Sequence, residues 1–308
     1  MEIILAQPRG FCAGVERAIN IVEKSLEKFG APIYVRHEIV HNKYVIESLR
    51  DKGVVFIDEL ADVPAGSVVI FSAHGVSEKV EEDAKNRNLS VIDATCPLVT
   101  KVHKEAIIND IKGNELILIG HVGHPEVEGT SGRVKQNVQI ISNIKDVDNI
   151  VCKDPDKIAY VTQTTLSVDD TKQIISKLKE KFPNISGPDT KDICYATQNR
   201  QNAVKQLADI ADIILVLGAK NSSNSNRLRD LSVEMGVDSY LIDTVADLDL
   251  SWLEGKKRIG VTAGASAPEI LIQQLVDYLK LLYNAKVITM DGAIENIKFK
   301  LPKKLIEG

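Results

Sequence analysis

The sequence is poor in several features that mark whole classes of protein. Four cysteines in 308 residues are too few for a disulfide scaffold. No apolar run approaches the roughly 20 residues of a membrane-spanning helix, and no basic segment followed by an apolar core marks a secretory signal. The 38 Lys and Arg residues are outnumbered by 43 Asp and Glu, which argues against a general nucleic-acid surface. We therefore expect a cytoplasmic protein that binds neither nucleic acid nor membranes.

Two nucleotide-binding patterns are also missing. The phosphate-loop pattern G-x-x-x-x-G-K-S/T is absent, and the stretch GAKNSSN (218–224) departs from it. No G-x-G-x-x-G follows a predicted strand, so no nicotinamide or flavin site is expected. If the protein is a redox enzyme, its electrons come from outside.

What the sequence does contain is a regular alternation of strand and helix signals. Apolar runs such as SVVIF (67–71), ELILIG (115–120) and DIILVLG (212–218) each lead through a polar loop into an amphipathic helical pattern. This alternation is typical of parallel sheets covered by helices. The fold class predicted is therefore α/β, with mostly parallel sheets.

The chain also repeats on a longer scale, because three cysteines recur at nearly equal steps. Cys96 lies 84 residues after Cys12, and Cys194 lies 98 residues after Cys96. Each cysteine directly precedes a helical pattern. Cysteines, strands and loops keep the same step independently, so three copies of one α/β unit are predicted. The predicted boundaries are 14–96 for the first repeat, 97–193 for the second, 1–13 with 194–284 for the third, and 285–308 for a C-terminal tail.

Two polar loops accompany each cysteine, and all of them follow predicted strands. One set comprises 37–42, 121–130 and 219–226, and the other comprises 72–77, 162–167 and 263–269. In parallel sheets, ligands bind beyond the carboxyl ends of the strands. If the three copies pack around a pseudo-threefold axis, their loops and cysteines meet in one central cavity.

Three cysteines in register leave three interpretations open. Each thiol could be a buried small hydrophobe. Together they could bind zinc, although zinc prefers four ligands, often in C-x-x-C pairs, and no such pair occurs here. They could also hold an iron–sulfur cluster, in which three thiolates would leave one iron of four open to substrate. Cys152 has no counterpart in the repeat, and we predict that its role is structural.

The polar loops carry hydroxyl, amide and imidazole groups suited to an anion. Helix N-termini offer unpaired N–H groups, so several of them aimed into one cavity would hold a phosphate or diphosphate. Helix capping is the competing explanation: Ser266 and Ser167 each precede an acidic residue by three positions, as in a capping box. The candidate loop residues are His41, Asn42, His74, His121, His124, Glu126, Thr164, Thr165, Ser222, Ser223, Asn224 and Ser266.

Glu126 is the carboxylate within a histidine-rich loop. Most loop acids are exposed and solvated. Burial beside a ligand would instead raise the pKa of this carboxyl and make it a proton donor. Glu128, two residues further along, is the competing carboxylate.

Nine motifs in order resemble those of the 4-hydroxy-3-methylbut-2-enyl diphosphate reductases, the last enzymes of the non-mevalonate isoprenoid pathway. They span residues 7 to about 270, and no motif position that carries chemistry departs from the family pattern. The motifs are PRGFCAGVERA, VHN, SAHGVS, DATCPLV, GHPEVEGT, TQTTLS, DICYATQNRQ, GAKNSSNSNRL and TAGASAPE.

The resemblance implies a three-lobed α/β protein arranged around a central iron–sulfur cluster. The cluster would be 4Fe-4S, and its loss of the one iron without a thiolate would leave 3Fe-4S. Glu126 would deliver protons, and Thr164 would bind the substrate hydroxyl and orient Glu126. The implied cluster ligands are Cys12, Cys96 and Cys194. The implied substrate-binding residues are His41, His74, His124, Thr164, Ser222, Ser223, Asn224 and Ser266.

The implied reaction removes the substrate hydroxyl as water with two electrons and two protons, giving isopentenyl and dimethylallyl diphosphate. A ferredoxin or flavodoxin is the implied electron donor. Two alternatives stay open at this point. One is a zinc or thiolate hydrolase acting on a phosphate ester, and the other is a non-catalytic iron–sulfur sensor.

Overall fold

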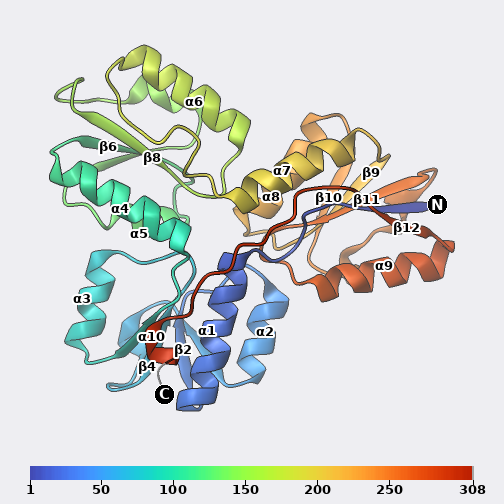
Figure 1. Cartoon of the computed structure of the whole chain (residues 1–308), viewed down its shortest axis with the longest axis horizontal. Coiled ribbons are helices and arrows are strands. Elements are labelled where there is room, and N and C mark those ends of the chain that lie inside the picture. Colours follow the sequence, from blue (N-terminus) through green and yellow to red (C-terminus); the bar gives the residue numbers. More distant parts are fainter. Residues whose placement is uncertain (307–308) are drawn as a thin grey trace. The chain divides into compact units, whose positions relative to one another are not determined.

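Three parallel β-sheets with flanking helices make up residues 1–306, the part of the chain that this computed structural model describes (Figure 1). These residues divide into two compact units. The first unit comprises Met1–Glu16, His41–Glu47 and Tyr195–Lys298. The second comprises Arg17–Val40, Ser48–Cys194 and the C-terminal stretch from Phe299. The first unit holds one of the sheets and the second holds the other two.

The sheet of the first unit has the strand order β10-β9-β11-β1-β12, and every neighbouring pair is parallel. Helix α9 packs on one face of this sheet, and α7 and α8 pack on the other (Figure 1). The strands are β1 (Glu2–Leu5), β9 (Ile213–Leu217), β10 (Ser239–Ile242), β11 (Arg258–Ala263) and β12 (Lys286–Thr289). The helices are α7 (Tyr195–Ala208), α8 (Ser223–Glu234) and α9 (Glu269–Tyr283).

Strand β9 shows why the sequence pattern predicted a buried parallel sheet. Its five residues IILVL are apolar without alternation, and all five are buried. A strand covered by helices on both faces needs apolar side chains at every position. The two faces of this sheet accordingly form two separate apolar clusters, one under α9 and one under α7 and α8.

The second unit contains a four-stranded and a three-stranded sheet, both parallel, with strand orders β3-β2-β4-β5 and β7-β6-β8. Helices α4 and α5 cover one face of the smaller sheet, and α6 covers the other. The strands are β2 (Ile33–Arg36), β3 (Val54–Ile57), β4 (Val68–Phe71), β5 (Ser90–Asp93), β6 (Glu115–Ile119), β7 (Val138–Ile141) and β8 (Ile158–Thr162). The helices are α1 (Ala13–Phe29), α2 (Lys43–Asp51), α3 (Glu78–Asn86), α4 (Pro97–Ile111), α5 (Pro125–Ser131), α6 (Val168–Lys181) and α10 (Lys303–Ile306), with α1 and α2 shared between the units. Short 3-10 turns are η1 (Leu60–Asp62), η2 (Ile144–Asn149), η3 (Val245–Asp247) and η4 (Leu250–Leu253).

The predicted fold class, an α/β chain with parallel sheets, is confirmed. The strands of each sheet come from a single predicted repeat, except that β12 comes from the predicted tail. The repeat boundaries and the arrangement around a central cluster stay predictions. Within residues 1–306, no helix is both long enough and apolar enough to cross a membrane.

The C-terminal segment contacts both units in turn. Its strand β12 pairs with β1, and Met290 donates its amide to the Leu5 carbonyl at 2.9 Å in the first unit. Further along, the Lys300 carbonyl accepts a hydrogen bond from Arg17 Nε at 2.8 Å in the second unit. Lys304 Nζ donates to Ser90 Oγ at 2.6 Å in that same unit.

Two leucines of helix α9 allow the packing of the first unit to be tested by substitution. Leu275 is fully buried under the sheet, whereas Leu281 on the same helix is 84% exposed. Leu275→Ala should lower the free energy of unfolding by about 2–5 kcal/mol, because it opens a cavity. Leu281→Ala is the matched control and should change it little. Urea denaturation measures both, and equal losses would contradict the packing described.

Candidate functional site

Each of the three cysteines predicted to act together stands at a helix N-terminus. Cys96 is the N-cap of α4, with Pro97 at the first helical position, where the missing N–H is tolerated. Cys12 and Cys194 directly precede α1 and α7. A helix N-terminus favours a thiolate, because unpaired N–H groups and the helix dipole stabilise negative charge.

The backbone amide of each cysteine donates to a carbonyl in one set of polar loops. The three carbonyls lie in the loops 72–77, 162–167 and 263–269, which the sequence had placed in register. This shared contact explains why each cysteine and its loop recur at the same step. The bonds are Cys12 N to Ala265 O at 3.2 Å, Cys96 N to Ala73 O at 3.0 Å and Cys194 N to Thr164 O at 3.0 Å.

The three cysteines are free thiols, the chemical group that binds an iron–sulfur cluster. None of the four cysteines of the described chain is in a disulfide, and all are partly buried. Burial raises the pKa of the Cys12 thiol. Cys12 belongs to the first unit, and Cys96 and Cys194 belong to the second. Among residues 1–306 no group of three His, Cys, Asp or Glu residues stands out as a metal site, so the convergence of the three thiols stays a prediction.

Glu126 is not the exposed loop acid that loop position alone suggests, because it is only 3% exposed. It is the second residue of α5, and Thr164 holds its carboxylate with two hydrogen bonds. The Thr164 amide donates to Oε1 at 2.6 Å, and Thr164 Oγ1 donates to Oε2 at 2.9 Å. Glu128, the competing carboxylate, is exposed. The predicted pairing of Glu126 with Thr164 is thus present within the second unit.

Burial raises the pKa of Glu126 to about 7, and the negative charge of Asp192 acts in the same direction. The two bonds from Thr164 oppose this shift, because they stabilise the charged form. The carboxyl can therefore both hold and release a proton near neutral pH. That property is what a general acid needs.

Two of the candidate histidines, His74 and His124, lie near each other in space, and His124 stands two residues before Glu126 in the sequence. His124 is the N-cap of α5, and its Nδ1 accepts the Glu126 amide at 3.1 Å. The rings of His124 and His74 meet edge to face, with centroids 5.7 Å apart. His74 Nδ1 also lies 3.2 Å from Ser72 Oγ. Two imidazoles and a buried carboxyl thus come from strand-end loops of both sheets in the second unit.

A second group of candidates comes together in the first unit around the start of α8. Ser222 is the N-cap of that helix, and its Oγ accepts the Ser225 amide at 3.3 Å. Ser266 Oγ donates to the His41 carbonyl at 2.9 Å, and His41 Nδ1 lies 3.3 Å from Asn221 Nδ2. His41, Ser266 and the N-terminus of α8 are therefore neighbours.

Asn224 is a buried amide in this group. It is 4% exposed, and neither Oδ1 nor Nδ2 has a hydrogen-bond partner among residues 1–306. A buried amide without partners costs stability, so such groups are rare, and a bound ligand or ion is one explanation for them. Ser223, its neighbour, is the first residue of the same helix.

The two capping expectations had different outcomes. Ser167 caps α6 as expected, because its Oγ accepts the Asp170 amide at 3.1 Å. The expectation for Ser266 was wrong. Helix α9 begins at Glu269 with Pro268 as its N-cap, and the Ser266 hydroxyl is turned to His41 instead.

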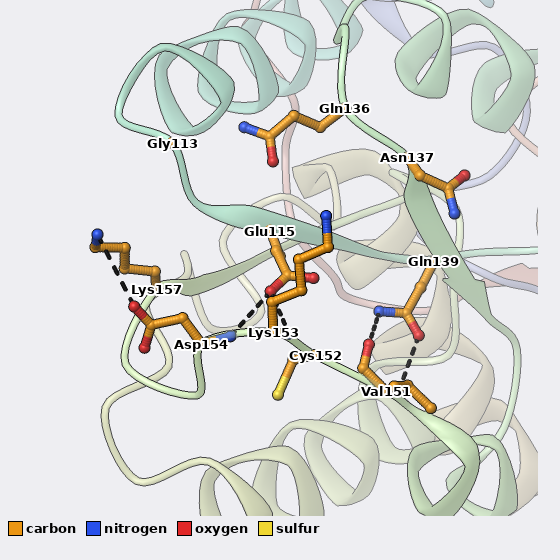
Figure 2. A pocket seen from close by; sticks show the side chains of 10 residues that line it. All are labelled: Gly113, Glu115, Gln136, Asn137, Gln139, Val151, Cys152, Lys153, Asp154 and Lys157. Atoms are coloured by element: carbon orange, nitrogen blue, oxygen red, sulfur yellow. Dashed lines mark hydrogen bonds and ion pairs between the residues drawn. The ribbon is translucent and has the colours of Figure 1, made fainter.

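Cys152 lies apart from the strand-end loops. Figure 2 shows it in a hollow with Glu115 and Lys157, where β6 and β8 begin, which is the opposite end from the ligand-binding end of a parallel sheet. Its side chain packs against the apolar cluster under α6. This position agrees with the structural role predicted for Cys152.

Asp192, a buried carboxylate two residues before Cys194, was not among the residues predicted from the sequence. Its Oδ2 accepts the Thr162 amide at 3.2 Å, and its Oδ1 accepts Lys101 Nζ at 3.2 Å. Burial raises the pKa of Asp192 to about 6. The only signal available was its place two residues before a cysteine, and that place does not reveal burial.

The fold and these groups define an α/β protein that carries thiols, imidazoles and a buried acid on the loops at its strand ends. The chain belongs to the LytB protein family, which it matches over residues 3–280. It is 60% identical over 307 residues to 4-hydroxy-3-methylbut-2-enyl diphosphate reductase of Azoarcus sp. (strain BH72), covering 100% of this chain and 98% of that one. It is 57% identical to reductase 1 of that name from Rhodopseudomonas palustris, covering 98% and 99% of the two chains.

Solved structures give the same result. The E-1-hydroxy-2-methyl-but-2-enyl-4-diphosphate reductase of Plasmodium falciparum superposes with a TM-score of 0.96 at 43% identity, over 99% of this chain and 96% of that one. A second structure, of the terminal enzyme of the non-mevalonate pathway, gives a TM-score of 0.64 at 32% identity, over 91% and 100% of the chains. The predicted family and its oxidoreductase class are confirmed, and the hydrolase and sensor alternatives are not favoured.

The burial of Glu126 predicts how stability depends on pH. Its pKa rises from an ordinary 4.5 to about 7 on folding, so the folded protein loses stability as pH climbs through this range and the buried carboxyl must ionise. Glu126→Gln cannot ionise. The free energy of unfolding of Glu126→Gln, relative to that of the native protein, should rise by roughly 3 kcal/mol from pH 5 to pH 8. Urea denaturation at each pH measures this difference.

Glu128→Gln is the matched control, because that side chain is exposed. It should follow the native curve. A difference between Glu126→Gln and the native protein that stays constant from pH 5 to pH 8 would contradict the burial of an ionisable carboxyl at this position.

Proposed function

We propose that this chain reductively removes the hydroxyl of 4-hydroxy-3-methylbut-2-enyl diphosphate, giving isopentenyl and dimethylallyl diphosphate and water. Its full-length relatives carry the name of this reductase. The observation that carries the proposal in this chain is the buried Glu126 held by Thr164, because the reaction needs a proton source in a dry site. Two electrons and two protons balance the conversion.

Cys12, Cys96 and Cys194 would hold a 4Fe-4S cluster through three thiolates. When bound, the cluster would supply the electrons and one Lewis-acidic iron that carries no protein ligand. The thiols support this assignment by their position at three helix N-termini, where thiolates are favoured. Cys152 takes no part, because it lies at the opposite end of its sheet.

The diphosphate would be bound by polar groups without a cluster of basic residues. Ser222 and Asn224 stand at the start of α8, where backbone N–H groups favour an anion. The unpartnered amide of Asn224 supports a ligand at this point. His41, His74, His124, Ser223 and Ser266 complete the proposed set.

Glu126 would donate the proton, and Thr164 would bind the substrate hydroxyl. At pH values below about 7 the buried carboxyl is protonated and can donate. Thr164 fixes both carboxylate oxygens, so the acid has one orientation. The same threonine would bind the substrate hydroxyl that leaves as water. Of the two protons, one would go to this oxygen and the other to carbon.

An external protein would deliver the electrons one at a time. No nicotinamide or flavin pattern occurs in the sequence, so a ferredoxin or flavodoxin is the proposed donor. The cytoplasm remains the predicted compartment.

Turnover of Glu126→Gln tests the proposed function. The amide cannot donate a proton readily, so kcat should fall by about 10²–10⁴-fold. Iron and sulfide contents should stay at the native level. Native kcat should itself decline as pH rises above about 7, because the acid form of Glu126 is lost. Glu128→Gln should behave as native, and near-normal turnover of Glu126→Gln would remove the carboxyl from the reaction.

Substitution of Asn224 distinguishes a role in substrate binding from a role in folding. Because its amide is buried without a partner in the described chain, Asn224→Ala should raise the free energy of unfolding of the ligand-free protein, since it removes the cost of that unsatisfied amide. It should raise the KM for the diphosphate about tenfold or more, since a hydrogen bond to a charged group is lost. Asn202→Ala, at an exposed position of α7, is the control. An unchanged KM with lowered stability would show that Asn224 serves only the fold.

A further inference from the structure

A basic residue follows each of the three cysteines at nearly the same distance. Arg17 lies five residues after Cys12, and Lys101 lies five residues after Cys96. Arg200 lies six residues after Cys194. At 3.6 residues per turn, each one stands about one and a half turns into the helix that its cysteine begins.

Arg17 follows Cys12, yet its Nη1 binds the loop before Cys96. Its Nη1 donates to the Ala94 carbonyl at 3.3 Å and to the Thr95 carbonyl at 3.0 Å. These are the two residues directly before Cys96. The first helix therefore holds the loop of the second cysteine.

Lys101 makes the corresponding contact one step further along the chain. Its Nζ donates to the Lys191 carbonyl at 3.3 Å and to Asp192 Oδ1 at 3.2 Å. Both residues belong to the loop that ends at Cys194. The Asp192 side chain is fully buried, so this contact anchors the loop to the interior.

Arg200 makes the third contact and is the most buried of the three cations, with no exposed surface. Its Nε and Nη2 donate to the Gly10 carbonyl at 3.1 and 2.7 Å, and Nη2 also donates to the Phe11 carbonyl at 3.2 Å. Gly10 and Phe11 directly precede Cys12. The third helix therefore returns to the loop of the first cysteine.

The contacts form a closed cycle, in which the helix after each cysteine fixes the backbone before the next one. We propose that Arg17, Lys101 and Arg200 are positioning residues that hold the three cysteine loops ready for the cluster. This inference rests on the proposed function, because it takes the cysteines as cluster ligands. Charged donors suit the task, since their hydrogen bonds to carbonyls are stronger than neutral ones, and one guanidinium can reach two carbonyls.

The partners of the cations support the assignment. Arg200 forms an ion pair with Glu295 of the C-terminal segment at 3.1 Å, and Asn199 donates to the same carboxylate at 3.0 Å. Arg17 donates from Nε to the Lys300 carbonyl at 2.8 Å. The C-terminal segment thus fixes both arginines. Lys101 has Glu105 one turn away at 3.3 Å.

Hydrogen–deuterium exchange of the full-length protein, purified anaerobically, tests the cycle. Each cysteine amide is hydrogen-bonded, so its exchange reports the opening of its loop. Arg17→Met should speed exchange about tenfold in residues 92–96 and leave 8–12 unchanged. Lys101→Met should do the same in 190–194, and Arg200→Met should do so in 8–12. Tenfold is the low end expected for losing a charged hydrogen bond.

Further variants make the test specific. Lys101→Arg keeps the cation and should restore native exchange, and Arg229→Met removes an arginine of an exposed ion pair on α8 and should change none of the three loops. Glu295→Gln keeps the shape beside Arg200 and should loosen 8–12 more mildly, which covers the case in which Arg200→Met does not fold. In each cation variant, the visible absorption should be lost to a chelator faster than in the native protein.

Three results would overturn the proposal. One is faster exchange in the loop of the cysteine that begins the substituted helix, in place of the loop that the cation contacts. The others are equally faster exchange in all three cysteine loops, and exchange at the native rate in all of them. Iron and sulfide analysis of the same samples keeps the two ideas apart. A native protein without iron would refute the proposed function, whereas the pattern of loop exchange would still confirm or refute the cycle of contacts.

Discussion

The hydrogen bond from each cysteine amide to a strand-end loop is the contact on which the rest of the site depends. It fixes the start of a helix against the carboxyl end of a parallel sheet, and it occurs three times, at Cys12, Cys96 and Cys194. A parallel sheet gathers its loops at one end, and a helix that begins there directs its N–H groups toward the same end. Each cysteine therefore stands, within its own unit, at a helix N-terminus that favours negative charge.

Two buried polar groups are central to the proposed chemistry, and they differ in how their hydrogen-bonding groups are satisfied. Glu126 is held by two hydrogen bonds, yet burial keeps its pKa near 7. Asn224 is buried with both amide atoms unpartnered in residues 1–306, at the start of a helix. In the proposed reaction, the first group would be organised before substrate binds, as a proton donor must be. The second would bond to the ligand, and its cost in stability is expected of a binding residue.

Much of this could be predicted from the sequence, because local pattern determines it. Unbroken apolar runs such as Ile213–Leu217 predict buried parallel strands, and a cysteine before each helical pattern predicts the three helix starts. Contacts between distant residues could not be predicted. Ser266 satisfies a capping pattern, yet its hydroxyl is turned to His41, 225 residues away. The complete burial of Arg200 likewise depends on Gly10 and Glu295, which lie far from it in the chain.

The central claim is that three cysteines, and not the fourth, hold an iron–sulfur cluster. The most direct measurement is iron and acid-labile sulfide in anaerobically purified protein and in the four single Cys→Ser variants. We expect near-equal iron and sulfide in the native protein and in Cys152→Ser, with large losses in Cys12→Ser, Cys96→Ser and Cys194→Ser. Zinc without sulfide, or loss of the cluster in Cys152→Ser alone, would contradict the account.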